Sequence, residues 1–145
     1  MFDITEMNRT EEAAKRIAAV LRAGDVVKLI GEMGAGKTTF VKELVRALNS
    51  DADVTSPTFA LAQHYDGPLP VWHIDLYRVE DPEELEDIGY ETYFYPEDAV
   101  TLIEWPQIAE DYLPDDTLAI TIHLTDNART LIPDAVLMRR LEANR

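Results

Sequence analysis

The sequence predicts an α/β protein, a three-layer sandwich in which helices cover both faces of a mostly parallel sheet with an inserted antiparallel hairpin. Two short apolar runs rich in β-branched residues, 25–30 and 99–103, are typical of buried parallel strands. The first run leads into 39–48, whose apolar residues recur on one helical face. A Gly- and Pro-rich turn at 66–70 separates two further strand-like segments. Because no repeat, low-complexity tract or linker interrupts the pattern, we expect a single domain over residues 1–145.

Local signals predict the other elements. Asn8 followed by Glu11 matches a capping box, which predicts a helix from Asn8 that ends at Gly24. Asp81 before Pro82 supplies an N-cap and a first-turn proline for a short helix. The further elements, in chain order, are an edge strand at 2–4, hairpin strands at 60–65 and 71–77, a helix at 82–88, an irregular aromatic stretch at 90–96, strands at 117–124 and 130–132, and a helix from 133 with Val136, Leu137 and Leu141 inward.

Composition narrows the classes of function. The chain has 13 Lys and Arg against 28 Asp and Glu, a formal net charge of −15. This balance argues against broad binding of nucleic acid, which depends on clustered basic residues that neutralise phosphates. There are no cysteines, which excludes disulfides and thiolate metal sites. No apolar run approaches membrane-spanning length and no signal region is visible, so we expect a cytoplasmic protein that does not bind membranes.

The segment at 31–38, Gly-Glu-Met-Gly-Ala-Gly-Lys-Thr, fits the pattern G-x-x-x-x-G-K-[ST] of the phosphate-binding loop, or P-loop. It lies between a predicted strand and a predicted helix, which is the structural context that the motif requires. Its glycines allow the backbone to curl so that N–H groups point at a phosphate at the helix N-terminus. Lys37 is then expected to reach the β- and γ-phosphates, and the Thr38 hydroxyl to take a position on Mg²⁺. The motif predicts nucleotide binding by a P-loop NTPase-like fold.

Hydrolysis also needs a carboxylate that holds the metal or orients water, usually at the end of a neighbouring strand. Glu104 follows the cleaner apolar run, so we favour it as the carboxylate for Mg²⁺ and water. Asp75, which follows another apolar run and is flanked by His73 and Arg78, is the second candidate. Taken singly, either acid is more commonly a turn-capping residue, but the P-loop favours a catalytic role. The catalytic candidates are therefore Lys37, Glu104 and Asp75.

Other polar groups give weaker signals. The segment 56–58, Ser-Pro-Thr, fits a switch-like loop or simply a turn. His73 and His123 lack metal-ligand spacing, so we propose no zinc site. The aromatic residues of 90–95 are interleaved with acids, which favours core or a partner surface over a nucleic-acid platform. The guanine-selecting pattern N-K-x-D is absent, so nothing favours GTP.

Together these segments resemble the TsaE family, the small bacterial ATPases of tRNA threonylcarbamoyladenosine synthesis. The resemblance covers nearly the whole chain, and its specificity lies outside the widely shared P-loop. Met33 and Gln107 stand where a leucine and often an acid occur in the family. The segments that carry it are Gly-Glu-Met-Gly-Ala-Gly-Lys-Thr-Thr-Phe (31–40), Ser-Pro-Thr-Phe (56–59), His-Ile-Asp-Leu-Tyr-Arg (73–78), Pro-Glu-Glu-Leu-Glu-Asp-Ile-Gly (82–89) and Ile-Glu-Trp-Pro (103–106).

The resemblance implies a Mg²⁺-dependent ATPase that works with TsaD and TsaB, the proteins that transfer the threonylcarbamoyl group to the adenosine beside the anticodon. It implies Mg²⁺ at Thr38 and Glu104, and contact with tRNA only indirectly, through the complex. Activity alone is expected to be weak and dependent on the partners. The implied nucleotide-binding residues are Met33, Gly34, Ala35, Gly36, Lys37, Thr38, Thr39, Met7 in the N-terminal segment, and Arg129 in the C-terminal strand region.

Two alternatives stay open at the level of sequence. A small-molecule kinase shares the P-loop but needs an arginine-rich lid, and the arginines beyond the P-loop helix are scattered. A non-catalytic nucleotide-sensing adaptor would keep Gly36, Lys37 and Thr38 and tolerate loss of Glu104. Phosphate release with and without candidate acceptors separates the kinase from an ATPase. Measurement of ATP hydrolysis by a Glu104 variant separates the adaptor from an ATPase.

Overall fold

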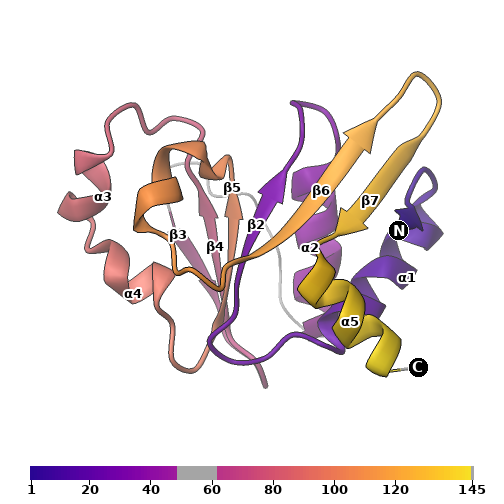
Figure 1. Ribbon diagram of the computed structural model, residues 1–145, viewed down its shortest axis with the longest axis horizontal. Helices are drawn as coiled ribbons and strands as arrows, with labels where there is room; N and C mark the ends of the chain where they lie inside the picture. Colours follow the sequence, from indigo (N-terminus) through magenta and orange to yellow (C-terminus); the bar gives the residue numbers. More distant parts are fainter. Residues whose placement is uncertain (49–61, 145) are drawn as a thin grey trace.

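The structure, a computed structural model, describes residues 1–48 and 62–144, and in this part of the chain seven strands form one sheet in the order β1-β7-β6-β2-β5-β4-β3 (Figure 1). The central strands β6, β2, β5 and β4 are parallel, whereas β1–β7, β7–β6 and β4–β3 pair antiparallel. The sheet is therefore mixed, with its parallel part in the centre. The strands are β1 (Phe2–Asp3), β2 (Val26–Ile30), β3 (Ala62–Tyr65), β4 (Val71–Asp75), β5 (Val100–Glu104), β6 (Leu118–Leu124) and β7 (Arg129–Pro133).

The two apolar runs form the middle of this sheet, as predicted. Every residue of β5 is buried, and β2 beside it is buried or half-buried throughout. Such strands read as continuous apolar runs because both of their faces are covered. The predicted hairpin is also confirmed from Ala62 onward, where β3 pairs antiparallel with β4. However, β4 pairs in parallel with β5 as well, so the hairpin extends the main sheet at its edge.

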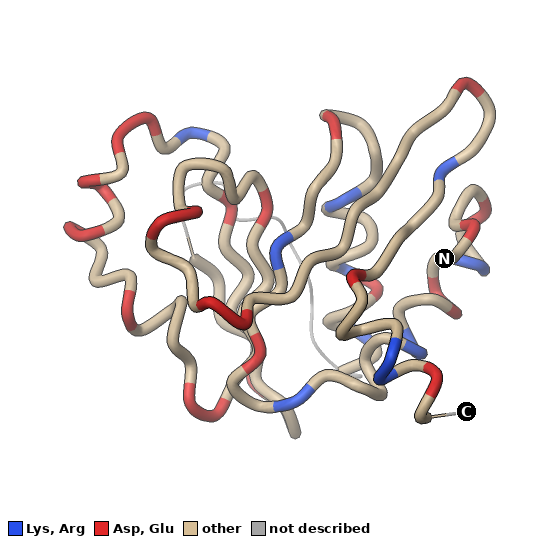
Figure 2. The backbone as a smooth tube through the Cα atoms, viewed as in Figure 1, with Lys and Arg blue, Asp and Glu red and all other residues tan. Residues whose placement is uncertain are grey.

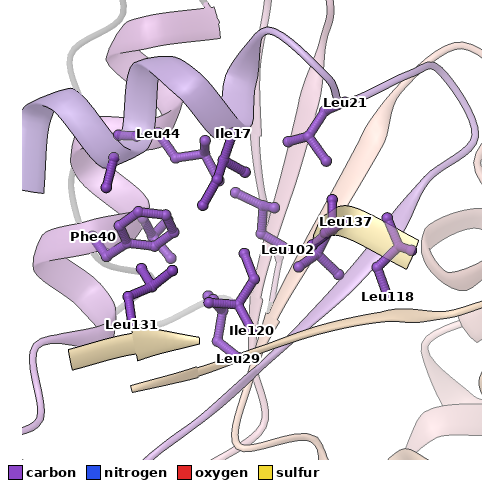
Figure 3. Packing of buried hydrophobic residues seen from close by; sticks show 14 of the residues in the cluster. Ile17, Leu21, Leu29, Phe40, Leu44, Leu102, Leu118, Ile120, Leu131 and Leu137 are labelled. Atoms are coloured by element: carbon purple, nitrogen blue, oxygen red, sulfur yellow. The ribbon is translucent and has the colours of Figure 1, made fainter. Parts of the chain in front are cut away.

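Helices cover both faces of the sheet (Figure 1). Leu29 and Leu102 belong to one buried cluster with residues of α1, α2 and α5, as Figure 3 shows. Val26 and Ile103, which point to the opposite face, belong to a second cluster with α3, α4 and the 3₁₀ helix η1. The helices are α1 (Met7–Ala18), α2 (Lys37–Leu48), α3 (Glu83–Asp87), α4 (Tyr90–Phe94), η1 (Pro106–Tyr112) and α5 (Ala135–Ala143). None of the helices in the described ranges is both long and apolar enough to span a membrane.

The prediction for the first helix was wrong at both ends. Helix α1 starts at Met7, before Asn8, and its N-cap residue Glu6 makes no side-chain capping hydrogen bond. The buried Thr10 hydroxyl donates to the carbonyl oxygen of Ile4, which draws the chain into the first turn ahead of Asn8. The helix ends at Ala18 rather than Gly24. Gly24 instead has a φ of 94°, and its N–H donates to the carbonyl oxygen of Ala99, the residue before β5, so this glycine shapes the entry to β2.

The aromatic stretch that we expected to be irregular contains helix α4. Gly89 before it has a φ of 71°, which lets the chain turn directly from α3 into α4. Phe94 is completely buried, and Tyr90 contacts the rings of Phe94 and Tyr112 at centroid distances of 5.9 and 4.9 Å. Burial of these rings against η1 stabilises a helix that local propensity does not predict.

The predicted cap at Asp81 agrees with the structure, whereas the predicted start of the last helix does not. The Asp81 side chain accepts from the Glu83 N–H, while the Glu84 carboxylate accepts from the Asp81 N–H, so α3 has a reciprocal cap. Helix α5 begins at Ala135 rather than at 133, because Pro133 is the last residue of β7, and Asp134 caps the helix by accepting from the Leu137 N–H. Leu137 and Leu141 are buried as predicted, but Val136 is 40% exposed, because neighbouring helical residues point about 100° apart and only one of the two can face the core. The segment 56–58 lies outside the described residues.

Candidate functional site

The loop between β2 and α2 runs along the carboxyl end of the parallel strands. A Cβ added to Gly31 would lie 2.8 Å from the carbonyl oxygen of Ile122 in β6, so only glycine fits this close approach. Gly34 and Gly36 have φ angles of 84° and 101°, which residues other than glycine rarely adopt. Helix α2 begins at Lys37, two residues earlier than predicted, so Lys37 and Thr38 lie in its first turn. The glycines therefore deliver these two side chains to the sheet edge.

A pocket of ≈ 350 Å³ opens beside this loop, within the range of about 300–1,000 Å³ typical of small-molecule sites. Two predicted site residues do not line it. Ala35 is completely buried in the core, and Met7 is 53% exposed at the start of α1. The lining residues are Met33, Gly34, Gly36, Lys37, Thr38, Thr39, Asp75, Tyr77, Glu104, Trp105 and Arg129. Strands β4, β5 and β7 thus bring the predicted acids and Arg129 to the same pocket as the loop.

Glu104 is the central acid of the pocket. It is the last residue of β5 and only 2% exposed. One carboxylate oxygen, Oε1, accepts a hydrogen bond of 2.8 Å from the Thr38 hydroxyl. The other, Oε2, lies 2.6 Å from Nε2 of His73. A hydroxyl and a carboxylate oxygen this close form a pair that can hold a hard cation such as Mg²⁺, which usually takes one or two protein oxygens and completes its shell with phosphates and water.

Asp75 stands beside Glu104, because the two residues are register partners at the ends of β4 and β5. It is half-buried, and its Oδ1 accepts a 2.9 Å hydrogen bond from the N–H of Tyr77. The N–H of Leu76 donates to the carbonyl oxygen of Glu104, which keeps the two strand ends together. Both predicted acids therefore border the same pocket, but Glu104 is the one that contacts Thr38.

Lys37 is buried at the bottom of the pocket. Its Nζ donates to the carbonyl oxygen of Gly31 and lies over the indole ring of Trp105. Burial lowers the pKa of Lys37, and the negative charges of Glu104 and Asp75 offset this shift only in part. The ammonium is thus held by a carbonyl oxygen and an aromatic face.

Trp105, Tyr77 and His73 were not predicted as site residues. Trp105 has a φ of 55°, which is uncommon for a residue with a side chain, and its ring centroid lies 5.0 Å from that of Tyr77. Both aromatic residues line the pocket, and His73 lies behind Glu104. The sequence signal that could have identified them is their position, because all three belong to the segments 73–78 and 103–106 that also contain the two acids.

Arg129 reaches the loop from the first position of β7. Its guanidinium Nη2 lies 3.4 Å from the carbonyl oxygen of Gly34, and its side chain passes close to Gly36. Its backbone N–H donates to the Thr5 hydroxyl, and its carbonyl oxygen accepts from Ile4. The N-terminal segment therefore adjoins the site through Thr5 and the backbone of Arg129.

Fold and pocket define a class: an α/β protein whose glycine-rich loop joins a central parallel strand to a helix, with two strand-end acids facing the loop. Residues 4–131 match the family model described as "Threonylcarbamoyl adenosine biosynthesis protein TsaE". The chain belongs to the TsaE family.

Individual relatives agree with this assignment. The tRNA threonylcarbamoyladenosine biosynthesis protein TsaE of Bacillus subtilis is 45% identical over 114 residues, which cover 78% of this chain and 70% of that protein. The protein of the same name from Rickettsia bellii is 36% identical over 132 residues, or 88% of this chain and 90% of the relative. The crystal structure of Bacillus subtilis YdiB superposes with a TM-score of 0.74 at 33% identity and covers 94% of this chain and 89% of that chain.

Proposed function

We propose that this protein is the ATP-binding and ATP-hydrolysing component of the machinery that makes threonylcarbamoyladenosine in tRNA, and that it acts with TsaD and TsaB to support repeated turnover. Its fold then belongs to the P-loop NTPase-like three-layer sandwiches. Membership of the TsaE family supports the pathway. The chemistry is supported by the residues of the pocket.

The hydrogen bond between Thr38 and Glu104 carries the proposal. It joins the last residue of the P-loop motif to a buried strand-end acid, beside the buried Lys37. In a P-loop NTPase this hydroxyl and such an acid serve the magnesium, which neutralises developing charge on the phosphates. Thr38 and Glu104 would hold Mg²⁺, the loop amides and Lys37 would bind the phosphates, and Glu104 would orient the attacking water. Asp75 would assist from the neighbouring strand end.

Charge supports an indirect relation to tRNA. The net charge is −15, and Figure 2 shows acidic residues along the segment that holds α3 and α4. Such a surface lacks the cations that neutralise phosphates in sequence-independent binding. We therefore assign tRNA binding to TsaD and TsaB, and we expect the protein to hydrolyse ATP slowly alone. A charge-stabilising group supplied by a partner can accelerate phosphoryl transfer by about 10³–10⁵-fold.

The test is multiple-turnover incorporation of labelled threonine into tRNA by the reconstituted proteins, with calorimetric titration of the protein by ATP in Mg²⁺. We expect tighter binding of ATP than of GTP, an ATPase rate that rises with TsaD and TsaB, and incorporation that stops after the first round with Lys37→Ala or Glu104→Gln. Undiminished turnover with Glu104→Gln, or tight tRNA binding by this protein alone, would refute the proposal. Transfer of phosphate to an added small molecule would instead indicate a kinase.

A further inference from the structure

A buried histidine lies behind the proposed metal-binding carboxylate. His73 has 0% exposure, and its Nε2 is 2.6 Å from Oε2 of Glu104. Because an ionised carboxylate can only accept a hydrogen bond, Nε2 carries the proton and donates. Nδ1 is buried and has no hydrogen-bond partner among the described residues. The hydrogen bonding of the ring within residues 1–48 and 62–144 is therefore directed to Glu104.

The pairing is a consequence of strand register. In the parallel pair β4–β5, His73 is opposite Leu102 and Asp75 is opposite Glu104. Residues two apart share a face of a strand, so His73 and Glu104 lie on the face that also carries the buried Leu102 beneath α2. Thr38, in the first turn of α2, reaches the carboxylate from the helix above this face. Histidine and threonine thus bind different oxygens of one carboxylate.

We infer that His73 is a positioning residue that fixes the rotation of the Glu104 carboxylate, so that Oε1 stays directed at Thr38 and the metal position. The inference rests on the proposed function, because it concerns the carboxylate assigned there to Mg²⁺ and water. The carboxylate of Glu104 can rotate about the last bond of its side chain. Two donors, the Thr38 hydroxyl and His73 Nε2, bind separate oxygens and restrict this rotation. Groups of this kind, one shell behind a metal ligand, commonly change metal affinity by about 10–100-fold when substituted.

A purely structural role of His73 predicts a different result from a positioning role. If the His73–Glu104 hydrogen bond only stabilises the interior, its loss lowers the free energy of unfolding and leaves the folded protein's Mg²⁺ dependence unchanged. If His73 positions the carboxylate, the folded variant needs more Mg²⁺ to bind ATP tightly. ATP affinity in the absence of Mg²⁺ changes little in both cases, because the loop and Lys37 are intact. The response to Mg²⁺ therefore separates the two roles.

The experiment compares His73→Leu, which removes the donor, with His73→Gln, whose amide N–H can replace Nε2–H. His64→Gln, the same substitution at an exposed histidine of β3, serves as the control. Calorimetric titrations with ATP are run across a MgCl₂ series and with EDTA, after thermal melting has established that each variant is folded. We expect the Mg²⁺ concentration for half-maximal tightening to rise about 10-fold or more in His73→Leu, and to stay within about threefold of wild type in His73→Gln and His64→Gln.

Two failures are distinguishable. If wild-type protein does not bind ATP, or binds it without any dependence on Mg²⁺, the proposed function fails and this inference fails with it. If wild type shows the dependence and folded His73→Leu shows the same one, the inference alone is overturned. Should His73→Leu not fold, His73→Asn takes its place, because its shorter amide cannot reach Glu104 from the same backbone position. An unchanged Mg²⁺ response in that variant would also overturn the inference.

Discussion

Lys37 Nζ lies 3.2 Å from the centroid of the Trp105 ring, over its face. The same nitrogen donates to the carbonyl oxygen of Gly31. Both contacts satisfy a buried ammonium, but neither supplies a negative charge, and burial lowers the pKa of Lys37. The negative charges of Glu104 and Asp75 offset this shift only in part. The carbonyl of Gly31 and the indole of Trp105 therefore hold the Lys37 side chain in the pocket, beside the loop.

We expect Lys37→Ala to weaken ATP binding by one to two orders of magnitude. The substitution removes charge-assisted hydrogen bonds worth about 1.5–3 kcal/mol. Calorimetric titration measures the change, and Lys15→Ala, at an exposed position of α1, provides the control. Equal ATP affinity in a folded Lys37→Ala protein would contradict the assignment of the loop.

Binding of ATP should weaken at alkaline pH. Burial lowers the pKa of free Lys37 from its ordinary value of 10.5, while phosphates would raise it again. Between these two pKa values binding takes up a proton, so affinity falls as pH rises through the pKa of the free protein. Titrations from about pH 8 upward, above the range in which the ATP phosphates titrate, should show this fall in wild type and not in Lys37→Ala.

The two acids should differ in hydrolysis. Glu104→Gln preserves the shape of the side chain but removes the charge beside Thr38, so ATP binding should persist while phosphate release falls by about 10²–10⁴-fold. Asp75→Asn should have a smaller effect, because Asp75 accepts from the Tyr77 backbone and does not contact Thr38 in the described structure. The reverse ranking in a phosphate-release assay would show that the roles of the two carboxylates are exchanged.

Two glycines of the loop should respond differently to alanine. A Cβ on Gly31 would meet the backbone oxygen of Ile122 at 2.8 Å, so β2 and β6 must separate and both stability and ATP binding should suffer. A Cβ on Gly34 has nothing within 4 Å, and its φ of 84° costs about 1–2 kcal/mol of backbone strain alone. Thermal melting and ATP titration of both variants test the ranking. A Gly31→Ala protein as stable as Gly34→Ala would contradict it.

Arg140 should stabilise the fold without affecting the site. Its guanidinium Nη1 donates to Oδ2 of Asp25 at 2.7 Å and to the carbonyl oxygen of Val20 at 3.2 Å, which ties α5 to the turn before β2. Hydrogen bonding to Asp25 raises the pKa of Arg140, as expected for a stabilised cation. Arg140→Met should lower the free energy of unfolding by about 1.5–3 kcal/mol, measured in urea, with ATP affinity unchanged. Arg139→Met, a substitution at the neighbouring position, should have little effect.

Local patterns were sufficient for several elements, although they misplaced both ends of α1. Three features could be predicted: the loop at 31–38, the apolar run that ends at Glu104 and the cap at Asp81. In each, the residue types of one short segment indicate the φ angles, the burial or the hydrogen bonds that the structure needs there. Helix α4 could not be predicted, because its stability comes from the burial of Tyr90 and Phe94 against distant residues rather than from helix propensity.

The sequence by itself identified Lys37 and Thr38 in the loop and the acids Glu104 and Asp75 at the strand ends. Tertiary structure decided which of them touch. Glu104 meets Thr38 across 66 residues and His73 across 31, and these contacts exist because β5 lies between β2 and β4. The residues of a buried apolar strand do not indicate which strands lie beside it, since any such strand can pair with another through backbone hydrogen bonds. Strand order is set by the packing of the whole core, and with it the partners of Glu104 and the aromatic face beneath Lys37.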